Sequence, residues 1–270
     1  MNEIDRYDCN LNHESIQEFY DYYRKQSLSE KNLQRIIAIE EIIVNKINGK
    51  NNSKILNVLD IGCGPGAMCI YWAKKGHNVH GLDINQPLLE LATNRAREEK
   101  LEIDFKLGTA TNLPWDDQSM DVCLVPELLE HVVDWRQCID EFCRVLKPNG
   151  ILFLSTNNKL CPRQQEFNLP LYSWYPGFIK RYCEKLALST HPEIAGYATY
   201  PAVNWFTFFQ LKKLLVTYGM ESFDRFDLMD VTKNGFIIKN IIFCIRSINF
   251  LRWLAHIVTP YTIIVSIKNK

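Results

Sequence analysis

The residues best suited to chemistry lie between Asp60 and Gly66, where an acidic side chain is followed by three glycines at alternate positions. Gly62 and Gly64 can adopt positive φ and let the backbone approach a ligand closely, which a Cβ would prevent. Gly66 falls where the following helix must pack tightly against the strand. Through Ala67 the stretch also fits Gly-x-Gly-x-x-Ala, so the pattern predicts a ligand-binding turn and leaves a dinucleotide-binding fold open.

A second acidic residue, Asp83, directly follows the apolar run Asn78–Leu82. A carboxylate at the end of the second strand of such a fold can accept hydrogen bonds from both hydroxyls of an adenosine ribose. A glycine turn alone is compatible with a tight connection between a strand and a helix. The turn and Asp83 together indicate a cofactor that contains adenosine.

Glu127, Glu130 and His131 follow another apolar run and carry groups that can move a proton. An imidazole titrates near neutrality, so His131 is the candidate general base, a role worth about 10²–10⁴-fold in rate. The alternative is a histidine at the start of a helix, hydrogen-bonded to a nearby carbonyl. Glu130 either orients the imidazole or forms an ion pair with an arginine such as Arg97.

The elements that must position these residues begin at Ile55, where short apolar runs alternate with amphipathic segments. This alternation is typical of βαβ units, which form a parallel sheet with helices on both faces. The predicted strands are Ile55–Ile61, Asn78–Leu82, Ile103–Leu107, Met120–Val125 and Ile151–Ser155. The predicted helices between them are Ala67–Lys75, Pro87–Glu99 and Trp135–Leu146.

Helical segments are expected before this core, and both helices and strands after it. The spacing of Ser27 and Glu30 predicts a capping box that opens an apolar helix, with an aromatic-rich helix at His13–Gln26 before it. The helix should end at the polar stretch Gly49–Ser53. Towards the end of the chain, the predicted elements are a helix from a Thr207 cap to Tyr218, a strand at Glu221–Phe226 and a closing strand at Tyr261–Ile267.

Five ordered motifs give the sequence a specific resemblance to the class I S-adenosylmethionine (SAM)-dependent methyltransferases over nearly all of 55–270. The motifs are Asp60–Gly66, Asp83, Gly108–Pro114, Met120–Cys123 followed by Glu127–His131, and Leu146–Gly150 followed by a strand. Among these enzymes, the chain is most similar to the ubiquinone-biosynthesis O-methyltransferase group. The resemblance implies a Rossmann-like α/β fold, in which a seven-stranded, mostly parallel sheet with an antiparallel last strand carries helices on both faces and a helical, aromatic cap.

The resemblance implies SAM as the cofactor and assigns site residues. The cofactor-binding residues are Asp60, Gly62, Cys63, Gly64, Gly66, Asp83, Ile84, Thr109, Ala110 and Pro126, and the catalytic candidates are His131, Glu127 and Glu130. Many relatives have an acidic residue where Thr109 stands. A threonine hydroxyl also accepts a hydrogen bond, so we expect adenine binding to be retained.

A divalent metal is the less favoured alternative at Glu127-x-x-Glu130-His131. This stretch is similar to the metal-binding stretch of small-RNA 2′-hydroxyl and ubiquinone-biosynthesis methyltransferases, which use an additional downstream histidine. The matching region, 201–207, contains no histidine, and the nearest upstream histidine is His191. We therefore assign no metal ligand.

The chain is expected to comprise four segments: a helical lid (1–52), a SAM-binding core (53–156), a substrate cap (157–205) and a C-terminal completion of the sheet (206–270). The cap has five prolines and many aromatic residues, consistent with a largely apolar pocket. The predicted pocket residues are Tyr20, Tyr23, Tyr172, Trp174 and Tyr200. For each of them the alternative is a place in a small core of the cap.

Composition narrows the classes of partner. Lys and Arg number 31, as do Asp and Glu, so the chain lacks the positive charge expected of a general nucleic-acid binder. A polar, acidic N-terminus and nine cysteines without Cys-x-x-Cys spacing favour a reduced, cytoplasmic location. The apolar stretch 236–258 can pack on the sheet, pair with a second subunit or rest on a membrane surface with Arg246 and Arg252 at the headgroups. The oligomeric state stays open.

The first functional interpretation is a SAM-dependent methyltransferase that moves a methyl group to a hydroxyl or carboxyl oxygen of a small molecule by in-line displacement. The alternatives are an N-methyltransferase acting on a small amine, an NAD-dependent oxidoreductase, and a SAM-binding protein without turnover. No nicotinamide-side domain follows the core, which disfavours the oxidoreductase.

Overall fold

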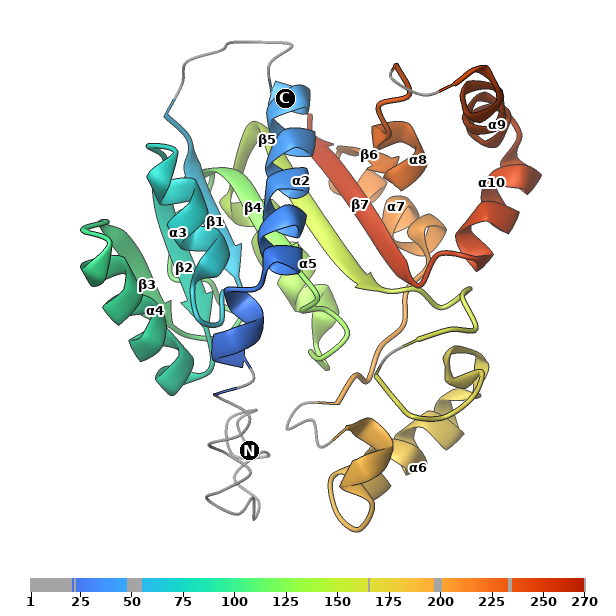
Figure 1. Cartoon of the computed structure of the whole chain (residues 1–270), viewed down its shortest axis with the longest axis horizontal. Helices are drawn as coiled ribbons and strands as arrows, with labels where there is room; N and C mark the ends of the chain where they lie inside the picture. Colours follow the sequence, from blue (N-terminus) through green and yellow to red (C-terminus); the bar gives the residue numbers. More distant parts are fainter. Residues whose placement is uncertain are drawn as a thin grey trace. The chain divides into compact units, whose positions relative to one another are not determined.

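The computed structural model describes residues 21, 23–47, 55–164, 166–196, 201–232 and 235–269 (Figure 1). The chain divides into two compact units. Unit 1 comprises Met1–Val125, Arg136–Phe153 and Lys270, and unit 2 comprises Pro126–Trp135 and Leu154–Asn269. The four predicted segments stay a prediction.

The strands form a seven-stranded sheet with the order β3-β2-β1-β4-β5-β7-β6. Their bounds are β1 (Asn57–Ile61), β2 (Asn78–Asp83), β3 (Ile103–Leu107), β4 (Met120–Pro126), β5 (Leu146–Asn157), β6 (Met220–Asp224) and β7 (Tyr261–Lys268). β1 runs parallel to β2 and β4, and β2 runs parallel to β3. β7 pairs antiparallel with β6, so the predicted mixed sheet with an antiparallel closing strand is confirmed.

The helices of unit 1 cover both faces of its strands. They are α2 (Glu30–Ile47), α3 (Ala67–Lys74), α4 (Gln86–Glu98) and α5 (Trp135–Val145). The chain steps from β1 outward to β3, and then from β4 to β5 in the opposite direction. Right-handed crossovers therefore put α3 and α4 on one face and α5 on the other. β5 begins at Leu146, earlier than predicted, because the strand directly follows α5.

The start of α2 differs from the prediction. Ser29 Oγ accepts the N–H of Asn32 at 3.2 Å, whereas Ser27 Oγ donates to the carbonyl of Arg24 at 3.0 Å. The predicted capping box at Ser27 is therefore wrong, because residues 23–27 are already helical and a turn at 28–29 separates them from α2. The aromatic segment 13–26 lies largely outside the described residues, and the break at 49–53 lies wholly outside them.

In unit 2, α7 (Phe208–Thr217) packs on β6 and β7. Thr207 Oγ1 accepts the N–H of Gln210 at 3.0 Å, which confirms the predicted cap. The predicted strand 221–226 is wrong at its end, because Asp224 stops β6 by capping the short helix α8 (Arg225–Leu228). Its Oδ1 accepts the N–H groups of Phe226 and Asp227, each at 2.9 Å.

The apolar stretch 236–258 forms two helices, α9 (Phe236–Ser247) and α10 (Asn249–Ile257), joined at an extended Ile248. Its two arginines, which the membrane alternative placed at lipid headgroups, bind groups of the protein. Arg246 donates to the carbonyls of Phe226 and Met229 at 2.9 and 2.7 Å, and Arg252 pairs with Asp227 at 2.6 Å. Among the described residues, no helix combines the length and apolar content that crossing a bilayer requires.

The described part of the cap contains η2 (Tyr172–Trp174), α6 (Gly177–Ala187) and η3 (Pro192–Ala195). It has a small core of its own, in which the ring of Tyr172 stacks on Phe167 at a centroid distance of 4.2 Å and meets Trp205 at 5.2 Å. Aromatic packing therefore contributes to the stability of the cap.

Candidate functional site

The glycine turn (residues 62–66) joins β1 to α3 in unit 1. Gly62, Gly64 and Gly66 have φ values of 77°, 50° and 76°, so all three occupy the left-handed region that other residues avoid. The N–H groups of Gly62 and Cys63 both donate to the carbonyl of Leu82, at 2.8 and 3.0 Å. The turn is therefore fixed against the carboxyl end of β2.

Two of these glycines serve different purposes. A Cβ on Gly66 would lie 2.8 Å from the Cβ of Ala92 and 3.2 Å from the ring of Phe105, so this glycine lets α3 pack against its neighbours. A Cβ on Gly64 would meet no atom within 4 Å. The backbone of Gly64 thus faces open space, where a ligand can approach it.

Asp83 ends β2 and faces this turn. Its Oδ2 accepts the N–H of Gly64 at 2.7 Å, and its Oδ1 accepts the N–H of Asn85 at 2.8 Å. Burial raises the pKa of the Asp83 carboxyl above its usual value, while backbone N–H groups of Asn85, Gly64 and Ile84 act in the opposite direction. A carboxylate has about four acceptor positions, so Asp83 keeps capacity to accept a ribose hydroxyl.

Asp60 lies at the end of β1 and is buried. The thiol of Cys69 donates to its Oδ2 at 3.4 Å, and its Oδ1 is buried without a partner among the described residues. Burial raises the pKa of Asp60 to about 7. An unsatisfied buried acceptor is costly, so a hydrogen-bond donor of a ligand that reached Oδ1 would be favoured.

Sequence reasoning missed Arg95 on α4, which stabilises the glycine turn through hydrogen bonds. Its guanidinium donates to the carbonyl of Pro65 at 3.0 Å, to Ser27 Oγ at 3.0 Å and to the carbonyl of Arg24 at 3.1 Å. The glycine turn is thereby tied to the helical segment that precedes α2. A single arginine on a surface helix carries no sequence signal for such a contact.

The other predicted cofactor residues are placed as follows. Thr109 Oγ1 lies 2.9 Å from Thr111 Oγ1 and stabilises the loop after β3. Ala110 is buried and Ile84 is exposed. Pro126 ends β4 and is the first residue of unit 2. Their contacts with a cofactor stay a prediction.

In unit 2, Glu127 opens the loop 127–132 with a φ of 53°, which is unfavourable for a residue with a Cβ. Its N–H donates to the carbonyl of Ser155 at 2.8 Å. Strained backbone of this kind persists where surrounding contacts hold it, and it is concentrated at functional sites.

Glu130 is buried in unit 2, and its Oε2 accepts the hydroxyl of Thr156 at 2.7 Å. The pKa of Glu130 is raised to about 8, chiefly by burial and in smaller part by the neighbouring carboxylates of Glu166 and Glu127, while the hydrogen bond from Thr156 acts in the opposite direction. At neutral pH its carboxyl is therefore mainly protonated. The predicted alternatives for Glu130 named His131 or an arginine as its partner; the structure gives it Thr156.

His131 is partly buried, and its backbone N–H donates to the carbonyl of Leu128 at 2.9 Å. The ring nitrogen Nδ1 is buried without a hydrogen-bond partner among the described residues. The imidazole thus has a ring position at which it can bind a substrate proton, as a general base must.

Asn204 holds this loop and was missed by sequence reasoning, which searched 201–207 only for a histidine. Its Nδ2 donates to the carbonyls of Leu129 and Val132 at 3.1 and 2.7 Å. The N–H groups of Val203 and Asn204 both donate to the carbonyl of Glu130, at 2.7 and 3.0 Å. Four hydrogen bonds from one short segment therefore position the catalytic candidates.

The residues of the metal alternative are not gathered into a metal site. Within the described part of the chain, no three His, Cys, Asp or Glu side chains form a group able to hold an ion. Oε2 of Glu130 already accepts the hydroxyl of Thr156.

Three predicted pocket residues are described. Tyr172 is fully buried in the core of the cap, Trp174 is half exposed and donates its Nε1 proton to the carbonyl of Leu160 at 3.0 Å, and Tyr23 is partly exposed. Tyr20 and Tyr200 lie outside the described residues. The cap also holds Lys180, whose ammonium lies 3.9 Å from the centre of the Trp205 ring and whose pKa burial lowers to about 8.

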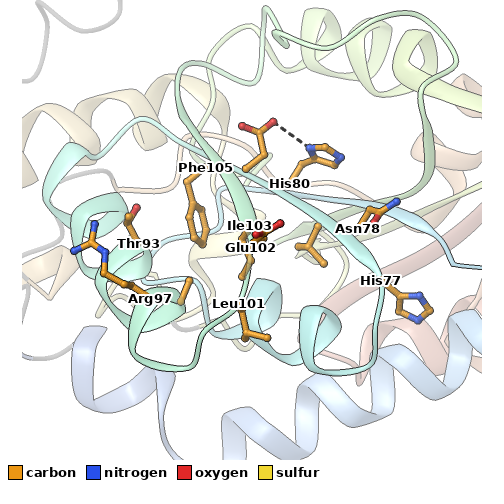
Figure 2. Close-up of a pocket in the computed structure, with 12 residues that line it drawn as sticks. His77, Asn78, His80, Thr93, Arg97, Leu101, Glu102, Ile103 and Phe105 are labelled. Atoms are coloured by element: carbon orange, nitrogen blue, oxygen red, sulfur yellow. Dashed lines mark hydrogen bonds and ion pairs between the residues drawn. The ribbon is translucent and has the colours of Figure 1, made fainter.

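A pocket of about 650 Å³ opens in unit 1 beside β2, β3 and α4 (Figure 2). Its lining includes Asn78 and Ile103, the first residues of their strands, and His80, whose Nδ1 lies 3.1 Å from Asp104 Oδ2. Open parallel sheets bind ligands at the carboxyl ends of their strands. We therefore place the cofactor site at the glycine turn and Asp83, at the opposite ends of these strands.

Comparisons with known proteins agree with this geometry. A sequence family described as a methyltransferase domain matches residues 59–154. The ubiquinone biosynthesis O-methyltransferase of Pelagibacter ubique is 34% identical over 163 residues, which cover 59% of this chain and 68% of that protein. The protein of the same name from Bartonella tribocorum is 36% identical over 104 residues, which cover 38% of this chain and 42% of that protein's length.

Solved structures show the same fold. A SAM-dependent methyltransferase from Methanosarcina mazei superposes with a TM-score of 0.52 at 25% identity, covering 83% of this chain and 97% of that one. The PH0226 protein from Pyrococcus horikoshii superposes with a TM-score of 0.57 at 17% identity, covering 93% of this chain and 99% of that one.

Proposed function

Since the chain belongs to the SAM-dependent methyltransferases, we propose that it transfers the methyl group of SAM to an oxygen atom of a small molecule. The observation that carries the proposal is the pairing of Asp83 with the N–H of Gly64, 2.7 Å apart. This pairing sets a carboxylate beside a backbone that faces open space.

On the donor side, SAM supplies a methyl group that its sulfonium already activates for displacement. The protein has to bind and orient it. Asp83 keeps capacity to accept a ribose hydroxyl, and the backbone of Gly64 lets the ligand approach. Asp60 offers its unsatisfied Oδ1 to a donor group. Orientation of this kind can supply roughly 7–11 kcal/mol of the barrier in the best cases.

On the acceptor side, a hydroxyl must lose its proton as the new bond forms. His131 takes that proton at Nδ1, the ring nitrogen that has no hydrogen-bond partner among the described residues. Glu130, with its raised pKa, stays mainly neutral and holds the loop through Thr156. The strained backbone of Glu127 fixes the path of the chain at the start of the loop 127–132.

The acceptor we favour is a hydroxyl on an aromatic ring. The curated relatives are named for O-methylation in ubiquinone biosynthesis, and ubiquinone carries methoxy groups on its ring. A carboxyl oxygen is the next choice, and a small amine is the competing one. The half-exposed ring of Trp174 in the cap is suited to contact with a flat, apolar ring.

The test is a transfer assay with SAM labelled in its methyl group and a panel of phenols, catechols, benzoates and arylamines. We expect label on hydroxyl acceptors, and a rate reduced about 10²–10⁴-fold by His131→Ala. His191→Ala changes an exposed histidine of the same unit and should leave the rate unaltered. Label confined to amines, or equal rates for the two variants, would contradict the proposal.

A further inference from the structure

The helix α9 exposes most of its apolar side chains. Phe236, Ile237 and Phe243 are 80%, 73% and 66% exposed, Ile241 is also exposed, and only Ile242 of the helix is buried. A helix that is apolar on all sides normally lies in a protein core or in lipid. Scattered exposed residues need no explanation, but a contiguous set of this kind marks an interaction site.

The helix α10 turns its polar side chains toward the protein and its apolar side chains away. Arg252 has a side chain only 13% exposed and His256 is buried, each bound to Asp224 or Asp227. Phe250 is 64% exposed, and its ring stacks with the exposed Trp253 at a centroid distance of 6.4 Å. This orientation is the reverse of a water-facing amphipathic helix.

The two helices form one platform in unit 2. α9 contacts α10 and α8, and Arg246 ties α9 to the carbonyls of Phe226 and Met229. Figure 1 shows the pair at the end of unit 2 beyond α8. The arginines therefore hold the helices in place and leave the apolar side chains outward.

The charged side chains of this segment all carry a positive charge. Residues 235–258 contain three Lys or Arg residues and no Asp or Glu, and Lys239 is exposed. A surface of apolar and aromatic side chains with a cation and no acidic group suits the boundary of an anionic lipid bilayer, where aromatic rings and cations are favoured.

We infer that the α9–α10 surface, formed by Phe236, Ile237, Ile241, Phe243, Phe250 and Trp253, docks on the surface of a lipid bilayer. The helices lie in the interface and do not cross it, since neither has the length to span a bilayer. A second copy of the chain fits the same surface less well, because a symmetric contact would bury Lys239 between two apolar surfaces whose segments contain no carboxylate to pair with it.

The test is flotation of the full chain with extruded phosphatidylcholine vesicles, with and without phosphatidylglycerol. We expect the chain to float with both, and about fivefold more tightly with the anionic lipid. The double variant Phe243→Asp and Phe250→Asp should weaken binding by about tenfold or more. Lys239→Glu should remove only the preference for anionic lipid. None of these readouts depends on methyl transfer, so this inference and the proposed function can fail separately.

Phe178→Asp is the matched control, because Phe178 is 68% exposed on α6 in the same unit; it should float like the parent chain. Quenching of tryptophan fluorescence by brominated acyl chains should fall in Trp253→Phe, which keeps the apolar ring. The inference is overturned if the parent chain does not float, or if the double variant floats equally well. It is also overturned if that variant only converts a dimer to a monomer in sedimentation while neither form binds vesicles.

Discussion

Two buried carboxyls, Asp60 in unit 1 and Glu130 in unit 2, hold protons at a pH where exposed carboxyls have released them. Burial raises the pKa of Asp60 to about 7 and that of Glu130 to about 8. The physical cause is the same, since a charged group is disfavoured away from water. Their contacts differ, because Asp60 keeps an unsatisfied oxygen and Glu130 is bonded to Thr156.

The raised pKa of Glu130 predicts a pH-dependent stability. The unfolded carboxyl titrates near 4.5 and the folded one near 8, so the stabilisation is complete below about pH 4.5 and is lost as the pH rises through about 8. Glu130→Gln keeps an acceptor for Thr156 and removes the titration. Urea unfolding at pH 5, 7 and 9 (chosen to bracket this window) should show the parent chain losing stability relative to the variant, on the order of a few kcal/mol. Asp60 titrates in both proteins and cancels in the difference; parallel curves would contradict the assignment.

At the scale of residues, sequence reasoning found those whose roles follow from the spacing of nearby residues. Gly64 and Asp83 belong to short motifs at the ends of strands, and the structure brings them to 2.7 Å. It could not find Thr156 or Asn204. Their partners lie far along the chain, at Glu130 and at Leu129 and Val132, and a threonine or an asparagine carries no signal for a distant contact.

At the scale of elements, the turn between β1 and α3 contains one glycine that packing requires and another that ligand binding requires. Gly66→Ala adds a Cβ 2.8 Å from Ala92, so we expect a loss of about 2–4 kcal/mol in the free energy of unfolding. Gly64→Ala should lower the free energy of unfolding only through its left-handed backbone conformation, by about 1–2 kcal/mol. Its Cβ enters the open space, so SAM affinity should fall about tenfold or more while the fold persists. Urea unfolding and calorimetry on both variants measure the two effects; Gly64→Ala with unchanged SAM affinity would contradict this division.

The segment before α7 positions the loop 127–132 through Asn204. Asn204→Ala removes two hydrogen bonds to buried or partly buried carbonyls, which should cost about 1–3 kcal/mol of stability. It should also lower kcat more than it raises KM for the acceptor, because the loop carries His131 and contains none of the predicted SAM-binding residues. The exposed Asn168 of the same unit provides the control Asn168→Ala. Equal kcat values for the two variants would remove Asn204 from its positioning role.

The order and type of the core elements were predictable because buried strands alternate with amphipathic helices from β1 to β5. The residues at which the later elements end were less predictable. Ile248 divides an apolar stretch that contains no glycine or proline, and Asp224 ends β6 by capping α8. Both depend on side chains that bind groups in other elements, since Arg252 pairs with Asp227 and His256 pairs with Asp224. Periodicity of apolar residues contains no information about such pairs.

At the scale of the whole molecule, the candidate functional residues are divided between the two units. The glycine turn, Asp83 and Thr109 belong to unit 1, whereas Glu127, Glu130 and His131 belong to unit 2. Strand β4 carries the chain directly from one to the other at Pro126. Donor binding and proton transfer are therefore separable by mutation.

Hydrogen exchange should map the donor site onto one unit. S-adenosylhomocysteine should slow exchange at the glycine turn 62–66, around Asp83 and in the loop 108–111. Peptides from 101–104, at the pocket of Figure 2, should exchange as in the free protein. Protection concentrated at 101–104 would move the donor site to that pocket and contradict the placement at the carboxyl ends of the strands.

The central claim is that the glycine turn and Asp83 bind an adenosyl sulfonium donor. Calorimetric titration of the purified chain with SAM and S-adenosylhomocysteine, and separately with NAD, tests it most directly. We predict binding of both SAM compounds, no binding of NAD, and about 10- to 100-fold weaker SAM binding in Asp83→Ala than in Asp104→Ala, which changes a more exposed carboxylate of the same unit. No heat with either SAM compound, or equal affinities in the two variants, would contradict the account.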